Sequence, residues 1–83
     1  MKTFTITTHG HQLEISASYW NGREKVVYDG KVVSDKRSFL FLTPHFFTVP
    51  EDGAAVVYEV NLLTGLAGIG YIVRRNGIAV ASS

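Results

Sequence analysis

An alternation of apolar and polar residues with a period of two limits the possible folds of this chain more than any other feature. Apolar side chains alternate with polar ones over residues 12–19, and Phe4 and Ile6 alternate with threonines in the same way. A period of two is that of a half-buried β-strand, whereas an amphipathic helix repeats every ~3.6 residues. No stretch of the sequence has the helical period. We therefore expect an all-β fold.

Turn-forming pairs separate these runs at short intervals. Asn-Gly and Asp-Gly supply the positive φ angles that tight hairpins need. The turn signals are His9-Gly10, Asn21-Gly22, Asp29-Gly30, Thr43-Pro44, Pro50 to Gly53, Thr64-Gly65 and Asn76-Gly77. Between them, strands are predicted over residues 2–8, 11–19, 23–28, 31–34, 37–42, 45–49, 54–62, 66–75 and 78–82.

The length of the chain allows one small hydrophobic core, because 83 residues are too few for two. Short antiparallel strands close such a core by stacking two sheets or by curling one sheet into a barrel. We favour the first solution, a compact antiparallel β-sandwich of two sheets with about eight or nine short strands. It forms a single domain over residues 1–83.

Composition excludes several classes of protein. The chain is 46% hydrophobic with a net charge of +1, which is too apolar and too weakly charged for a disordered segment. Without cysteine it has neither disulfides nor a thiolate zinc site. The N-terminal alternation is unlike a signal peptide, and residues 65–73 are far fewer than the ~20 that cross a bilayer. We expect a soluble, cytoplasmic protein with no membrane partner.

Some predicted strands are apolar on both faces. Residues 39–42 are the clearest case, and Phe46-Phe47 is another. Each sheet of a two-layer sandwich has one inner face, so alternate residues of such a run would point outward. Loops, bends or barrel curvature can cover the second face. Alternatively, a protein partner or another copy of the chain covers it, in a homodimer. The second alternative predicts an interface made by Phe39, Leu40, Phe41, Leu42, Phe46 and Phe47.

Residues that could support catalysis or metal binding are few. His9 and His11 lie two residues apart, and a zinc site would need His45 to approach them. Glu14 and Glu59 could pair as acid and base, but carboxylates on exposed strands usually serve solubility and edge protection. The serines lack the strand–turn–helix setting of a nucleophile elbow. We therefore expect no catalytic residues, no metal site and no cofactor.

Two further motifs concern nucleotides and nucleic acids. Residues 65–70 are glycine-rich, but they lack the Lys-Ser/Thr ending of a P-loop, and no helix is predicted after them. Aromatic residues interleaved with basic ones could bind single-stranded nucleic acid by stacking. The residues of this kind are Tyr19, Trp20, Tyr71, Arg23, Lys25, Arg74 and Arg75. Because the basic residues are dispersed among seven acids, we do not expect nucleic acid as a partner.

Two segments resemble the Fas apoptotic inhibitory molecule family. In residues 22–33, GREKVVYDGKVV, a basic residue, Val-Val-Tyr and an Asp-Gly-Lys turn follow one another as in that family. Residues 60–67, followed by Asn76-Gly77, are similar to a later strand and hairpin of the family, and residues 11–14 to an early strand. The likeness covers most of residues 11–80. It implies a compact β-sandwich and a non-enzymatic domain that acts through protein contacts. Animal members, which pair two such domains, are associated with protection from death-receptor apoptosis and with handling of aggregation-prone proteins.

These observations together predict a non-enzymatic protein-interaction module that self-associates and acts through an apolar sheet face or edge. The alternative is a β-domain that binds a small ligand or single-stranded nucleic acid. Its pocket would be lined by Trp20, Tyr19 or Tyr71.

Overall fold

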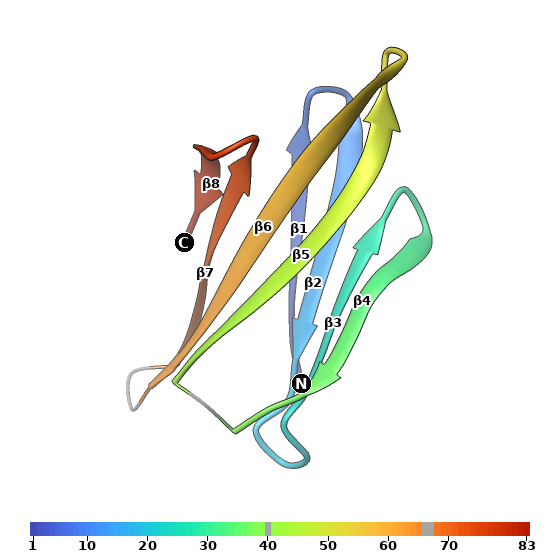
Figure 1. The fold of residues 1–83 in the computed structure, drawn as a ribbon. Coiled ribbons are helices and arrows are strands. Elements are labelled where there is room, and N and C mark those ends of the chain that lie inside the picture. Colours follow the sequence, from blue (N-terminus) through green and yellow to red (C-terminus); the bar gives the residue numbers. More distant parts are fainter. Residues whose placement is uncertain (40, 66–67) are drawn as a thin grey trace. The chain divides into compact units, whose positions relative to one another are not determined.

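The strands of the protein form two four-stranded antiparallel sheets in a computed structural model that describes residues 1–39, 41–65 and 68–83 (Figure 1). The chain divides into two compact units, Met1–Leu40 and Phe41–Ser83, and each unit contains one sheet. The predicted all-β class, the two antiparallel sheets and the number of strands, eight, are confirmed. The described ranges contain no helix that could span a membrane.

The first sheet is a meander in which each strand pairs with the next one in the sequence. Its strands are β1 (Lys2–Thr8), β2 (His11–Ala17), β3 (Arg23–Tyr28) and β4 (Lys31–Arg37). The alternation puts Leu13, Ile15 and Val26 on one face, where none of the three has any exposed surface. The threonines of β1 at positions 3, 5 and 7 lie on the other face and are exposed.

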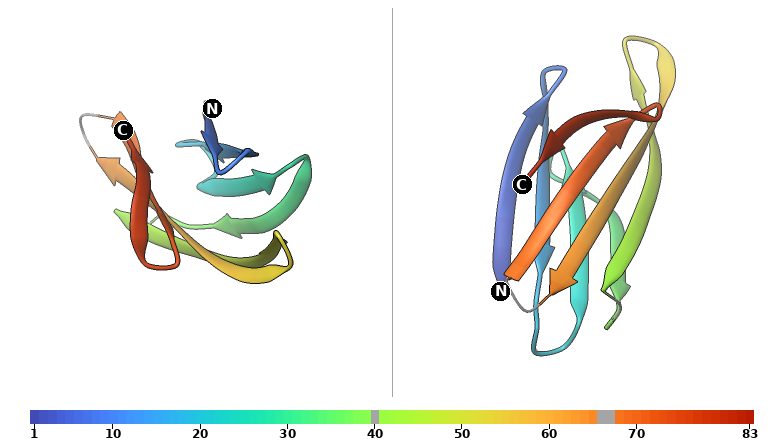
Figure 2. Two further views of the ribbon diagram at one scale, coloured as in Figure 1. Left: turned by 90° about the horizontal axis from the view of Figure 1, so that it is seen from above. Right: turned by 90° about the vertical axis from the view of Figure 1, so that its left-hand side faces the viewer.

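The second sheet repeats this meander with longer strands. Its strands are β5 (Leu42–Glu51), β6 (Ala54–Gly65), β7 (Gly68–Arg75) and β8 (Ile78–Ser82). Figure 2 shows β5 and β6 as a long, twisted hairpin. Tyr58, Val60 and Leu62 of β6 and Val73 of β7 are completely buried on one face of this sheet.

Four two-residue turns join the strands in pairs, and both central residues of each turn have positive φ. This is the backbone of a type I′ hairpin, whose twist matches that of the flanking strands. The turns are His9-Gly10, Asp29-Gly30, Asp52-Gly53 and Asn76-Gly77. In the last of them, the Asn76 side chain also accepts a hydrogen bond from the Val57 backbone N–H at 2.9 Å. These four turn signals of the sequence therefore predicted the hairpins correctly, whereas the turn predicted at Thr43-Pro44 is wrong because both residues lie within β5.

The connection from β2 to β3 is longer than the tight turn predicted at Asn21-Gly22, because it spans residues 18–22. Only Gly22 of that pair has a positive φ, at 68°. A Cβ atom at Gly22 would lie 2.7 Å from the carbonyl oxygen of Ser38, closer than real contacts allow. The position therefore requires glycine for its space as well as for its φ angle.

The separate strand predicted over residues 37–42 is wrong. β4 ends at Arg37, β5 begins at Leu42, and Phe39 and Phe41 lie in neither strand. Leu40 lies outside the described residues. Phe39 and Phe41 therefore lie between the two sheets in the sequence rather than in a strand covered on both faces.

The polar residues at the end of β4 belong to the strand because their cross-strand neighbours hold them there. Arg23 of β3 donates two hydrogen bonds to the Asp35 carboxylate of β4, at 3.2 and 2.8 Å. Opposite charges on neighbouring strands stabilise a sheet even where the strand residues are not hydrophobic. The prediction followed hydrophobicity alone, and so it ended this strand at residue 34.

β5 is longer than the predicted strand over residues 45–49 because it includes both prolines of the chain, Pro44 and Pro50. It lies at the edge of its sheet, where proline is tolerated because half of the backbone N–H groups face away from the neighbouring strand. The predicted turn that begins at Pro50 is therefore shorter, and Glu51 is the last residue of β5 rather than a turn residue.

Asp29 connects the turn between β3 and β4 to β2, and its contacts make the free energy of unfolding depend on pH in the acid range. Its carboxylate accepts a hydrogen bond from the Gln12 backbone N–H at 2.8 Å and contacts His11 Nδ1 at 2.6 Å. The Gln12 hydrogen bond first, and then the His11 contact, lower the pKa of Asp29. A lowered pKa in the folded state stabilises the protein above the unfolded pKa of about 3.9, and this stabilisation is lost as the pH falls through the folded value.

We expect Asp29→Asn to lower the free energy of unfolding at pH 7, because the amide lacks the charge that strengthens both contacts. The difference from the wild type should shrink as the pH falls below about 4, since the wild-type carboxylate then becomes protonated. Urea unfolding at both pH values measures this. A difference that is the same at both pH values would contradict the prediction.

Candidate functional site

The second sheet has an exposed apolar face, formed by the alternate residues of β5, β6 and β7 that point away from its buried face. The separation is clearest at the phenylalanine pair of β5, where 60% of Phe46 is exposed and only 8% of Phe47. We call this surface the exposed face. Its side chains on these strands are those of Leu42, Pro44, Phe46, Thr48, Pro50, Ala55, Val57, Glu59, Asn61, Leu63, Ile72 and Arg74.

The strand register places Asn61 of β6 in the interior of the exposed face, between β5 and β7. Pro44 of β5 and Ile72 of β7 lie directly opposite Asn61, one on each side. Glu59 and Leu63 precede and follow it on the same face of β6. These neighbours bury the residue, which is 7% exposed although it faces outward.

The Asn61 side-chain amide makes no hydrogen bond within the part of the chain that the structure describes. Every completely buried side-chain nitrogen or oxygen atom among those residues does have a partner. The polar atoms of Asn61 therefore still reach the surface, between Pro44 and Ile72. An amide in this position becomes unsatisfied as soon as an apolar surface covers it.

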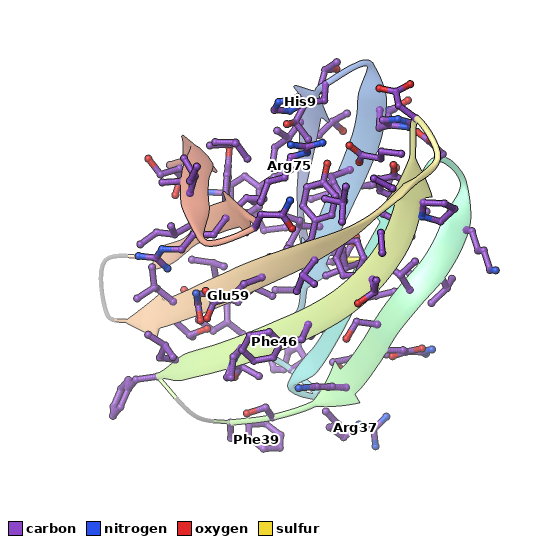
Figure 3. The ribbon with its side chains drawn as sticks, turned by 45° about the horizontal axis from the view of Figure 1, so that its top comes forward. His9, Arg37, Phe39, Phe46, Glu59 and Arg75 are labelled. Carbon is purple, nitrogen blue, oxygen red and sulfur yellow. The ribbon has the colours of Figure 1, made fainter. Side chains whose placement is uncertain are left out.

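An ion pair lies beside Asn61 on the exposed face. Arg74 of β7 and Glu59 of β6 are directly opposite in the register, and the Arg74 Nη1 atom lies 3.7 Å from Glu59 Oε1. Phe46 lies opposite Glu59 on the other side (Figure 3), so that Phe46, Glu59 and Arg74 form one row across the face. The pair adds no net charge to the face.

The residues predicted to form an interface do not all lie on one surface. Leu42 and Phe46 lie on the exposed face. Phe41 is exposed at a bend before β5, whereas Phe39 belongs to the first unit. Phe47 is buried and stacks on Tyr58 with 5.2 Å between ring centroids, so it is not available to a partner.

A buried polar cluster on the other face of the second sheet was missed by the sequence analysis. The Tyr58 hydroxyl donates a hydrogen bond to Glu51 Oε2 at 2.6 Å. Arg75 donates two hydrogen bonds to Glu51 Oε1, from Nε at 3.1 Å and from Nη2 at 2.9 Å. Each residue comes from a different strand, so the cluster ties β5, β6 and β7 together at the end of the sheet.

This cluster is suited to holding strands together rather than to proton transfer. Burial, and then the hydrogen bond to Glu51, raise the pKa of Tyr58 to about 12, so its hydroxyl keeps its proton at neutral pH. The Glu51 carboxylate likewise raises the pKa of Arg75, which remains charged. Arg75 and Arg74 point to opposite faces of β7, as the alternation predicted.

The other candidates from the sequence are not brought together within a unit. His9 and His11 lie in the first unit and His45 in the second, and no group of three metal-ligating residues occurs among residues 1–39, 41–65 and 68–83. Glu14 and Glu59 likewise belong to different units. In the glycine-rich segment, Leu66 and Ala67 lie outside the described residues, and strand β7 follows instead of a helix.

Aromatic and basic residues gather at one end of the first sheet. Tyr19 and Trp20 lie in the connection between β2 and β3, and 93% of Trp20 is exposed. Arg37 ends β4 directly opposite Arg23, which begins β3. Phe39 follows Arg37, as Figure 3 shows, and its ring approaches the position of Gly22. Tyr71 and Arg74 lie in the second unit.

No protein-family model, curated protein or solved structure matches the chain. The likeness to the Fas apoptotic inhibitory molecule family is therefore still a prediction.

We expect Glu51→Gln to destabilise the protein by about 2 kcal/mol, because the buried Tyr58 hydroxyl loses a charged acceptor. Tyr58→Phe should cost about 1 kcal/mol, the usual contribution of one hydrogen bond. Combined, the two substitutions should cost less than their sum, since they break the same contact. Chemical denaturation of the single and double variants measures this coupling. Strictly additive effects would show that the two side chains do not act together.

Proposed function

We propose that this protein is a non-enzymatic interaction module whose working surface is the exposed face of the second sheet. The observation that carries the proposal is the outward position of Phe46, a large aromatic side chain at 60% exposure, among other apolar residues on one sheet. Contiguous apolar surface of this kind is typical of sites where proteins bind one another. The resemblance to the Fas apoptotic inhibitory molecule family, if it reflects descent, supports the same mode of action.

The shape of this surface also favours a protein over a small ligand. Small molecules bind in concave pockets that enclose most of their surface. The face of a sheet presents a broad surface instead, and central aromatic residues commonly dominate the binding energy on such surfaces. Phe46 lies beside a polar pair, Glu59 and Arg74, that can set the orientation of the partner.

Affinity capture from a lysate of the source organism tests the proposal, with Phe46→Asp compared against the wild type. We expect the amount of any specifically bound protein that the variant retains to fall at least about tenfold, because the contact would desolvate the new carboxylate. Thr5→Asp, on an exposed position of β1, is the matched control and should behave like the wild type. Equal retention by Phe46→Asp and the wild type would refute the proposed surface.

A second candidate function, binding of single-stranded nucleic acid, is favoured by one observation in the first unit. Trp20 and Tyr19 are exposed near Arg23 and Arg37 at the end of the first sheet. Exposed aromatic rings beside arginines can stack on bases while the positive charges contact phosphates. Arg23 already shares its charge with Asp35, which weakens this second candidate.

Trp20 is the only tryptophan in the chain, so its fluorescence reports directly on this second candidate. Stacking on a base would quench the emission when an oligo(dT) of about ten nucleotides is added, and the effect would weaken as salt is raised. Arg37→Ala would reduce the affinity. Emission that does not change in a large excess of oligonucleotide would rule out this function.

A further inference from the structure

We propose, resting on the function proposed above, that the partner of the exposed face is a second copy of this chain, with Asn61 of each copy facing Asn61 of the other. The contact would be two-fold symmetric. Its polar centre would be a pair of hydrogen-bonded amides, surrounded by the apolar side chains of the same face.

The buried amide is what selects this partner. Asn61 is 7% exposed, and its amide has no hydrogen-bond partner among the residues that the structure describes. An apolar partner would close the remaining access to water and leave the carbonyl acceptor and the two N–H donors of the amide unsatisfied. An identical amide supplies a donor for the carbonyl and an acceptor for one N–H at once, because a primary amide carries donor and acceptor side by side.

In a two-fold symmetric dimer, a residue of one subunit can contact the same residue of the other subunit. In an isologous contact the same patch serves on both subunits, and only residues near the axis face themselves. Asn61 is suited to that place because it lies on β6, an interior strand of the four-stranded sheet, with β5 on one side and β7 on the other. A single buried asparagine pair sets register and subunit number in coiled coils by the same physics.

The size and charge of the exposed face are compatible with a weak homodimer. β5 has 10 residues, so the face is roughly 34 Å long, and three strands make it roughly 14 Å wide. Both copies together would cover on the order of 1,000 Å², which is at the lower limit for specific interfaces, where weak contacts are found. Glu59 and Arg74 compensate one another, so two copies do not repel through net charge.

Sedimentation equilibrium between about 10 and about 500 µM tests whether the second copy is the partner. The wild type should pass from monomer to dimer in this range. Asn61→Asp and Asn61→Lys should each raise the dissociation constant at least about tenfold, because like charges would face each other across the axis. Mixed in equal amounts, these two variants should associate at least as tightly as the wild type, since an aspartate then meets a lysine. Thr5→Asp is the control and should not change the dissociation constant.

Each failure has its own meaning. A wild type that stays monomeric up to about 500 µM overturns this inference but not the proposed function, which the capture experiment with Phe46→Asp still tests. A wild type that dimerises while the mixed variants remain apart overturns the position of Asn61 at the axis. If a variant does not fold by circular dichroism, nuclear Overhauser effects between labelled and unlabelled wild-type copies decide instead. Effects between the Asn61 amide protons and Asn61 or Ile72 of the other copy support the inference. If all the effects between copies come from other surfaces, the inference is overturned.

Discussion

The geometry of a β-strand, which sends successive side chains to opposite faces, is the constraint on which the rest of this structure depends. In β5 and β6 both sets of alternate residues contain apolar side chains, so burying one set leaves the apolar side chains of the other exposed. Phe46 and Phe47 are adjacent in the sequence and chemically identical, yet one is exposed and the other is stacked on Tyr58. No rotation of the strand can bury both, because a shift by one residue exchanges the two faces.

The polar side chains on the two faces of the second sheet differ in their hydrogen bonding. On the buried face, the Glu51 carboxylate receives hydrogen bonds from Tyr58 and Arg75, so no charge is left unpaired. On the exposed face, the Asn61 amide is nearly enclosed and yet receives no hydrogen bond from the described residues. The first arrangement is therefore complete within the chain, whereas any surface that covers the exposed face must supply partners for the Asn61 amide.

Much of the fold could be predicted from the sequence because its signals are local. Asp29-Gly30 and Asn76-Gly77 adopt the positive φ angles that such pairs favour, and the alternation in β1 and β2 identifies their buried residues. The strand predicted over residues 37–42 was wrong because hydrophobicity alone does not make a strand. The polar end of β4 is instead held in its sheet by Arg23 and Asp35.

The candidate site was predicted only in part, for a physical reason. The sequence indicates that an apolar face is left over and includes Leu42 and Phe46 in it, but also Phe47, which is buried. Asn61 could not be recognised, because its enclosure depends on Pro44 and Ile72, which are distant in the sequence and meet it only through the register of three strands. The same holds for Glu51, which resembles a turn residue until the length of β5 is known.

The central claim, that a second copy covers the exposed face, is tested most directly by hydroxyl-radical footprinting at increasing protein concentration. Phe41 and Phe46 are both exposed, but only Phe46 lies on the exposed face, so one spectrum contains the probe and its reference. The account predicts that oxidation of Phe46 falls relative to that of Phe41 between about 10 and about 500 µM, the range in which an interface of this size should form. A ratio that stays constant over this range would contradict it.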